Sequence, residues 1–263
     1  MREILVRAGE HAQLAREMRI QSGGTVVNAA RQDGDSDAKE ESEHSHLCIL
    51  TPDGPMPLAN TSVPAGNTKW ITVVAGLPRS GTSMLMQMLH AGGLPVLTDG
   101  QRTADEDNPR GYLEFNPVKT LHQKADWLND AVGKAVKVVT PLIPYLPGEQ
   151  DYRILFIERD MVEILASQTR MLERRGEIMD DTPARQMRLQ QEYGRQVRSL
   201  KAALALRPRT FVLCLSHAEV VRDPQMVAQA VNQFLGGGLD VSTMAAAVSP
   251  ALHRQRVTAA ADS

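Results

Sequence analysis

The segment Ile71-Thr-Val-Val-Ala-Gly-Leu-Pro-Arg-Ser-Gly-Thr-Ser83 decides the fold of this chain. Its first six residues are mostly apolar and end in glycine, which predicts a short buried strand over 71–76. The pattern of 83–93 predicts a helix. Between strand and helix, Gly76 and Gly81 stand at the spacing G-x-x-x-x-G of a phosphate loop. In such a loop, backbone N–H groups and the start of the helix hold an anion.

The loop differs from that of a nucleotide triphosphatase in the position of its cation. Thr82 stands where the triphosphatase has its lysine, and Arg79 lies inside the loop instead. The lysine acts on the β- and γ-phosphates together with Mg²⁺, so a loop without it is poorly equipped for ATP. A guanidinium can form two parallel hydrogen bonds with a terminal anion. The sequence therefore favours an anion other than the triphosphate of ATP.

The rest of the chain continues the alternation of strands and helices. Further strands are predicted at 134–140, 153–158 and 210–216, and further helices at 117–129, 161–174, 184–206 and 224–235. Such alternation is typical of a parallel sheet with right-handed crossovers. We therefore predict an α/β fold of the P-loop nucleotide-binding class, with a parallel sheet flanked by helices.

The first 68 residues read as an N-terminal extension to a domain over 69–263. Residues 1–20 carry apolar side chains at helical spacing and predict a short helix. Residues 32–46 are acidic and polar, which predicts disorder. Residues 51–68 are rich in Pro, Gly, Asn, Ser and Thr and are interpreted as a linker.

Composition argues against several classes of protein. The chain has 29 basic and 31 acidic residues in 263, so its formal net charge of −2 does not indicate a nucleic-acid-binding protein. No apolar run approaches the roughly 20 residues of a membrane-spanning helix, and the N-terminus does not resemble a signal peptide. Two cysteines, Cys48 and Cys214, form no metal-binding pattern and suggest a reducing compartment. We expect a cytoplasmic protein with no transmembrane segment.

The stretch Gly-Leu-Pro-Arg-Ser-Gly-Thr-Ser at 76–83 resembles the 5′-phosphosulfate loop of sulfotransferases that depend on 3′-phosphoadenosine 5′-phosphosulfate (PAPS). The form with arginine is typical of bacterial and protein-tyrosine members. The resemblance implies that the amides of 79–83, including that of Gly81, hold the 5′-phosphate and the sulfuryl oxygens. It implies the same role for four side chains of the loop, those of Arg79, Ser80, Thr82 and Ser83.

A second signature of that family follows a later strand. Arg159 comes directly after 153–158, and Ser167 lies eight residues further on inside a predicted helix. The resemblance implies that both hold the 3′-phosphate, at the carboxyl edge of the sheet where ligands of open α/β sheets bind. The alternative for Arg159 is an ion pair with Glu163 at i,i+4. The alternative for Ser167 is an ordinary polar position on a helix.

Sulfuryl transfer also needs a base that takes the proton of the acceptor. Asn108-Pro-Arg-Gly-Tyr-Leu-Glu114 resembles a segment common in bacterial members, and several branches of the family use a glutamate as base. We therefore assign the base to Glu114, with Asp107 next, and the stabilisation of charge to Arg79. A solvated acidic loop is the alternative. No metal is expected, because the consecutive side chains of 105–107 rarely converge on one ion.

The resemblance spans about 69–256, and its remaining parts are weaker. The segment 137–147 resembles one that carries Lys-Thr-His in cytosolic members, but its histidine is absent. His217 stands where the family usually has a tyrosine, which leaves the adenine contact open. Arg254 and Arg256 are candidates for late phosphate contacts or for a solvated basic tail.

These resemblances imply an enzyme that moves a sulfuryl group from PAPS to a hydroxyl or amine and releases 3′,5′-bisphosphoadenosine. The acceptor is left open among small molecules, carbohydrates, lipids and peptides, and so is the oligomeric state. One rival is a phosphotransferase with Glu158 or Asp160 on Mg²⁺. The other is a protein of the same fold that binds a nucleotide without turnover.

Overall fold

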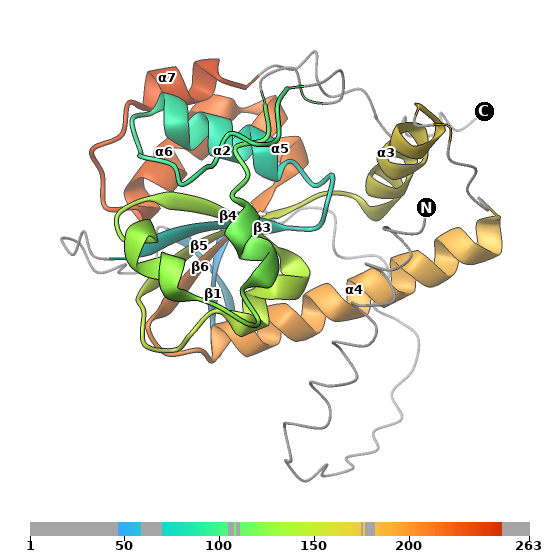
Figure 1. Ribbon diagram of the computed structural model, residues 1–263, viewed down its shortest axis with the longest axis horizontal. Helices are drawn as coiled ribbons and strands as arrows, with labels where there is room; N and C mark the ends of the chain where they lie inside the picture. The colour runs from blue at the N-terminus through green and yellow to red at the C-terminus, as the bar shows by residue number, and fades with distance from the viewer. Residues whose placement is uncertain are drawn as a thin grey trace, which may run out of the picture. The chain divides into compact units, whose positions relative to one another are not determined.

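The computed structural model describes residues 47–58, 70–104, 108, 111–174, 176 and 182–248. Within them lies a six-stranded sheet with the order β2-β1-β6-β5-β3-β4 (Figure 1). The strands are β1 (Cys48–Thr51), β2 (Gly54–Pro57), β3 (Ile71–Gly76), β4 (Ala135–Val139), β5 (Tyr152–Glu158) and β6 (Thr210–Ser216). The predicted α/β fold is confirmed.

The strand register brings the carboxyl ends of four strands to one edge of the sheet. β3 lies between β4 and β5, and β5 pairs with β6, all in parallel. Gly76, where the loop leaves β3, is opposite Val139 at the end of β4. Glu158 at the end of β5 is opposite Ser216 at the end of β6. The segments that follow these strands therefore start close to the phosphate loop.

The hairpin of β1 and β2 corrects the predicted start of the folded region. β1 pairs with β6 in antiparallel orientation, so residues 48–57 belong to the same sheet as the phosphate loop. The linker interpretation of 51–68 is therefore wrong for 51–57. Turn-forming residues do occur here, but Ile49 and Leu50 provide enough apolar surface for one strand, and Ile49 is buried. Residues 1–46 and 59–69, including the predicted helix over 1–20, lie outside the described residues.

Helices cover both faces of the sheet (Figure 1). They are α2 (Thr82–Ala91), α3 (Met161–Arg174), α4 (Pro183–Ala205), α5 (His217–Arg222), α6 (Pro224–Phe234) and α7 (Val241–Ala246), with 3₁₀ helices η2 (Asn116–Thr120), η3 (Asp126–Ala131) and η4 (Thr140–Tyr145). Alternate residues of each strand face opposite sides. Accordingly, Val73 packs in a core with α3, α4 and the 3₁₀ helices, whereas Val74 packs in a core with α2, α6 and α7.

The helix predicted over 117–129 is replaced by two 3₁₀ turns, η2 and η3. The core takes Val118 from the first, Leu121 from the position directly after it, and Trp127 and Leu128 from the second. The polar residues between them are mostly exposed, so no continuous apolar stripe supports a long α-helix here. No described helix is long and apolar enough to cross a membrane.

Candidate functional site

The phosphate loop has a backbone that tightly constrains its sequence. Gly81 has φ 106° and Arg79 has φ 74°, both in the left-handed region. A Cβ added to Gly81 would lie 2.7 Å from Cδ2 of His217, at the start of α5. A Cβ added to Gly76 would lie 2.7 Å from the carbonyl oxygen of Ile157 in β5. The loop therefore packs directly on the two neighbouring segments, and only glycine fits at both positions.

Ser80 contributes a buried hydroxyl to this loop. The residue is 1% exposed, and its Oγ has no hydrogen-bond partner within the described part of the chain. A buried hydroxyl without a partner costs about 1–3 kcal/mol. An anion seated among the loop amides would be such a partner, as it is in phosphate loops generally. The chemistry of the loop thus fits the phosphosulfate group that the sequence suggested.

The two predicted nucleotide motifs meet in the structure. Nε of Arg79 donates a hydrogen bond of 3.0 Å to Oγ of Ser167 on α3. Nη1 of Arg159 donates one of 3.2 Å to the carbonyl oxygen of Arg79. Arg79 from the first motif therefore forms one cluster with Arg159 and the buried Ser167 from the second. This cluster lies beside the glycine turn.

Arg159 also forms the ion pair that was its alternative explanation. Its Nε lies 2.8 Å from Oε2 of Glu163, and both side chains are nearly buried, at 10% and 13% exposed. Because the same guanidinium reaches the loop through Nη1, the two interpretations are compatible. Glu163 holds the guanidinium at the carboxyl edge of the sheet, next to the loop.

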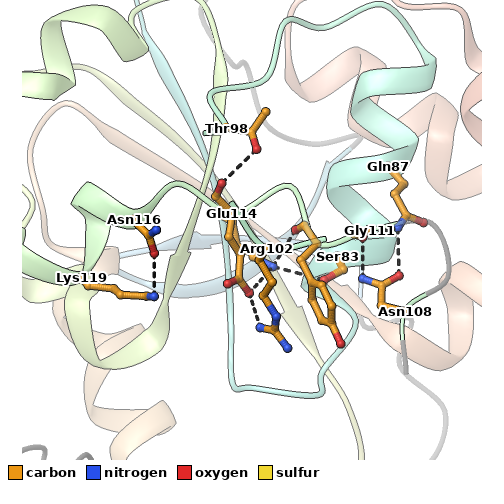
Figure 2. A network of polar contacts seen from close by, with 11 residues as sticks. Ser83, Gln87, Thr98, Arg102, Asn108, Gly111, Glu114, Asn116 and Lys119 are labelled. Atoms are coloured by element: carbon orange, nitrogen blue, oxygen red, sulfur yellow. Dashed lines mark hydrogen bonds and ion pairs between the residues drawn. The ribbon is translucent and has the colours of Figure 1, made fainter. Parts of the chain in front are cut away.

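Glu114 lies beside the same loop, in a network of charged groups (Figure 2). Its Oε1 is 2.8 Å from Nη1 of Arg102 and 3.1 Å from Nζ of Lys137. Lys137 also donates to Oγ of Ser83 at 3.2 Å and to the carbonyl oxygen of Tyr112 at 2.8 Å. The lysine thus connects the proposed base to the last residue of the loop motif.

Lys137 is a site residue whose role is not predicted from the sequence. Its side chain is 5% exposed, and burial lowers the pKa of its ammonium group while the ion pair with Glu114 acts to raise it. Lys137 lies in β4 between apolar residues, opposite Val74 of β3. Burying a lysine inside an apolar strand is costly. The single lysine in the strand sequence Ala-Val-Lys-Val-Val is therefore the feature from which a functional role for Lys137 could have been predicted.

The segment that carries Glu114 is fixed to the helix that follows the loop (Figure 2). Nε2 of Gln87 on α2 donates to Oδ1 of Asn108 at 3.1 Å and to the carbonyl oxygen of Gly111 at 2.9 Å. Oγ1 of Thr98 donates to the carbonyl oxygen of Glu114 at 2.9 Å. Glu114 therefore has a defined position, whereas Asp107, the second choice for the base, lies outside the described residues. Arg254 and Arg256 also lie outside them.

The two acids of the phosphotransferase rival have structural partners. Oε1 of Glu158 is 2.6 Å from Nζ of Lys201 on α4. Oδ1 of Asp160 accepts hydrogen bonds from the backbone N–H groups of Val162 and Glu163, at 2.8 and 3.2 Å, at the start of α3. These roles account for both carboxylates without a magnesium ion.

Fold and site together define an α/β protein of the P-loop class, with Arg79 inside the loop and Thr82 at the position of the triphosphatase lysine. A family model described as "Sulfotransferase domain" matches residues 71–251. The chain belongs to this sulfotransferase family, whose members transfer sulfate groups, as the resemblance implied. No curated protein matches the sequence closely enough to count as a relative.

Solved structures that match the chain include several bacterial sulfotransferases. The sulfotransferase domain of the Synechococcus PCC 7002 olefin synthase is 15% identical, and the alignment covers 76% of this chain and 93% of that one, with a TM-score of 0.44. Sulfotransferase STF9 of Mycobacterium avium is also 15% identical, with 76% and 71% covered and a TM-score of 0.42. A sulfotransferase of Alicyclobacillus acidocaldarius is 16% identical, with 66% and 85% covered and a TM-score of 0.41.

Proposed function

We propose that this protein transfers the sulfuryl group of PAPS to a hydroxyl or amine of a small-molecule, carbohydrate, lipid or peptide acceptor. The observation that carries the proposal is the cluster of Arg79, Arg159 and Ser167. A nucleotide with phosphate groups at both the 5′ and 3′ positions needs donors for two anions. We assign the first anion to the loop and the second to the segment after β5, whose donors lie next to each other in this cluster.

The 5′ end of the nucleotide is assigned to the loop. The amides of 79–83 and the hydroxyls of Ser80, Thr82 and Ser83 are the donors, and the buried Oγ of Ser80 has an unused hydrogen-bonding capacity. Arg79 supplies a fixed positive charge, since its guanidinium does not lose a proton in proteins. PAPS, when bound, supplies the activated sulfuryl group. Such fixed donors stabilise the negative charge that develops on a departing phosphate.

The 3′-phosphate is assigned to Arg159 and Ser167. Glu163 holds the arginine through Nε, and Nη1 reaches the carbonyl oxygen of Arg79 in the loop. Ser167 is tied to Arg79, so the serine connects the two anion sites. Hydrogen bonds to charged groups contribute about 1.5–3 kcal/mol each. Two of them would favour a nucleotide with a 3′-phosphate by roughly two orders of magnitude.

Glu114 is assigned the role of base. It would accept the proton of the acceptor hydroxyl or amine as the new bond to sulfur forms. Arg102 and Lys137 fix its carboxylate from two directions, and Lys137 ties it to Ser83 at the end of the loop. These contacts give the base a defined position relative to the loop.

Transfer of radiolabelled sulfate from PAPS to a panel of hydroxyl and amine acceptors tests the proposal. We expect transfer without added Mg²⁺, and competition by 3′,5′-bisphosphoadenosine but not by ATP. Mg²⁺-dependent binding of ATP without binding of the bisphosphate would favour the phosphotransferase instead. Binding of the bisphosphate without transfer to any acceptor would favour a nucleotide-binding protein without turnover.

The Glu114→Gln variant tests the assignment of the base in the same assay. The amide keeps the shape of the side chain but cannot take a proton, and general-base catalysis contributes typically 10²–10⁴-fold. We therefore expect a loss of transfer of at least about a hundredfold with unchanged affinity for 3′,5′-bisphosphoadenosine. Full activity of this variant would remove Glu114 from the mechanism.

A further inference from the structure

The two cysteines of the chain lie directly opposite each other on neighbouring strands. Cys48 of β1 and Cys214 of β6 are register partners in an antiparallel pair. Directly opposite residues of such a pair point to the same face, with Cα atoms about 4.5–5.5 Å apart. Disulfides join Cα atoms about 4.4–6.8 Å apart. The strands therefore present the two thiols at a separation that a disulfide can bridge.

The two thiols differ in access to solvent. Cys214 is 1% exposed and packs in the core beneath α4, whereas Cys48 is half-buried at the edge of the same cluster. A reagent in solution can therefore reach Cys48 first. Cys214 is buried and lies directly opposite Cys48, so its thiol is placed to attack a modified Cys48.

The surroundings of the pair favour a thiolate at Cys48, chiefly through its hydrogen bond with Cys214. A hydrogen bond from Cys214 and the positive charge of Lys201 lower the pKa of the Cys48 thiol, while burial and the carboxylates of Glu158 and Glu219 oppose this shift. The pKa of Cys214 is raised by the same hydrogen bond and by burial. Lys201 forms its ion pair with Glu158 at 2.6 Å, which fixes the ammonium group on the same side of the sheet. The nucleophile in thiol–disulfide exchange is the thiolate.

We propose that Cys48 and Cys214 are a modification site that forms a reversible disulfide with a small-molecule disulfide as the oxidant. The Cys48 thiolate attacks one sulfur of the oxidant, forms a mixed disulfide and expels a small thiolate. Cys214 then loses its proton and attacks the sulfur of Cys48, which forms the intramolecular bond and expels the second small thiolate. The two protein thiols are oxidised, the oxidant is reduced to two thiols, and the protons of the cysteines end on them.

The bond would close a loop between the N-terminal hairpin and β6. It would fix β1 to a strand that continues directly into α5, whose His217 packs against Gly81 of the phosphate loop. A cross-link between positions so far apart in sequence restricts the unfolded chain strongly. The oxidised protein should therefore unfold at a higher temperature than the reduced one.

Exposure of the full-length reduced protein to oxidised glutathione tests the proposal. Non-reducing peptide mapping by mass spectrometry should find Cys48 linked to Cys214, and dithiothreitol should return both free thiols. In Cys214→Ser, Cys48 should accumulate as a stable mixed disulfide with glutathione. In Cys48→Ser, Cys214 should stay unmodified over the same period, and circular dichroism verifies that both variants are folded.

Two results would overturn the proposal. One is a wild-type protein whose two thiols both remain open to alkylation after this treatment. The other is a wild-type protein with the mixed disulfide at Cys48 and no intramolecular link. Equal rates of modification of Cys214 in Cys48→Ser and of Cys48 in Cys214→Ser would contradict the assignment of Cys48 as the thiol that reacts first.

Discussion

Nε of Arg79 in the phosphate loop donates a hydrogen bond of 3.0 Å to Oγ of Ser167, 88 residues further along the chain. Arg79 has a left-handed backbone, so its side chain leaves the loop in a direction that an ordinary turn would not give. Ser167 is buried on the face of α3 that meets the loop. This contact joins two sequence motifs into one site, and its removal is a direct test of that site.

Ser167→Ala should weaken the binding of 3′,5′-bisphosphoadenosine about tenfold, because one hydrogen bond to a charged group is lost and Arg79 is no longer fixed. Isothermal titration calorimetry measures the affinity. Ser199→Ala, on the exposed side of α4, is the matched control and should bind like the wild type. Equal affinities of the two variants would show that Ser167 takes no part in nucleotide binding.

Arg159→Ala should weaken nucleotide binding far more than Arg174→Ala. Arg174 is the control because it is an exposed arginine at the C-terminal end of α3, the helix that follows Arg159. The loss should be specific to the 3′-phosphate. We expect a drop of roughly a hundredfold for 3′,5′-bisphosphoadenosine and little change for adenosine 5′-phosphate, because only the first ligand carries the group assigned to Arg159. A similar loss for both nucleotides would point to damage of the loop through Arg79 instead.

Much of this site could be predicted because each motif is local. The strand, glycine turn and helix around 71–91 are encoded by neighbouring residues, and Arg159 is placed by the strand that it follows. Parallel strands then bring both segments to one edge of the sheet. The sequence could not reveal that Arg159 would bond both to Glu163 and to the loop, because that depends on the packing of α3.

The features that the sequence missed depend on contacts between distant segments. β1 is a strand because β6 offers it a free edge, and its short, mixed sequence would not predict one in isolation. Lys137, Ser83 and Glu114 come from three separate segments, so the role of Lys137 in connecting the other two becomes visible only in the folded chain. The helix over 117–129 was predicted from a favourable start at Pro117, but core packing gave two 3₁₀ turns.

Gly81→Ala should both destabilise the protein and abolish nucleotide binding. A left-handed conformation costs a non-glycine residue about 1–2 kcal/mol, and the new Cβ would also lie 2.7 Å from the ring of His217. Gly100→Ala is the control, because Gly100 has φ 66° but a Cβ there would meet no described atom within 4 Å. Thermal unfolding and calorimetric titration should show a larger loss for Gly81→Ala in both measurements. Equal losses of stability in the two variants would mean that backbone strain alone, and not the contact with His217 of α5, requires glycine at position 81.

Lys137→Met should separate activity from stability. The wild-type ammonium is buried, which lowers its pKa below the ordinary 10.5, so folding is opposed while this group is charged. The folded state therefore gains stability as the pH rises from the lowered pKa of Lys137 toward 10.5. Methionine removes the charge and keeps an unbranched apolar side chain, one atom shorter than that of lysine, and Glu114 retains its ion pair with Arg102.

We therefore expect Lys137→Met to unfold at or above the wild-type temperature at neutral pH. The stability of the variant should also rise less than that of the wild type as the pH approaches 10.5, because the contribution of Lys137 is absent. Sulfate transfer from PAPS should fall at least about tenfold, because one oriented contact to the base and to Ser83 is lost. Lys124→Met, whose side chain is 73% exposed, should change neither property. A variant that transfers sulfate at the wild-type rate would make Lys137 a structural residue, and a large drop in the unfolding temperature would mean that its ion pair outweighs the cost of burying it.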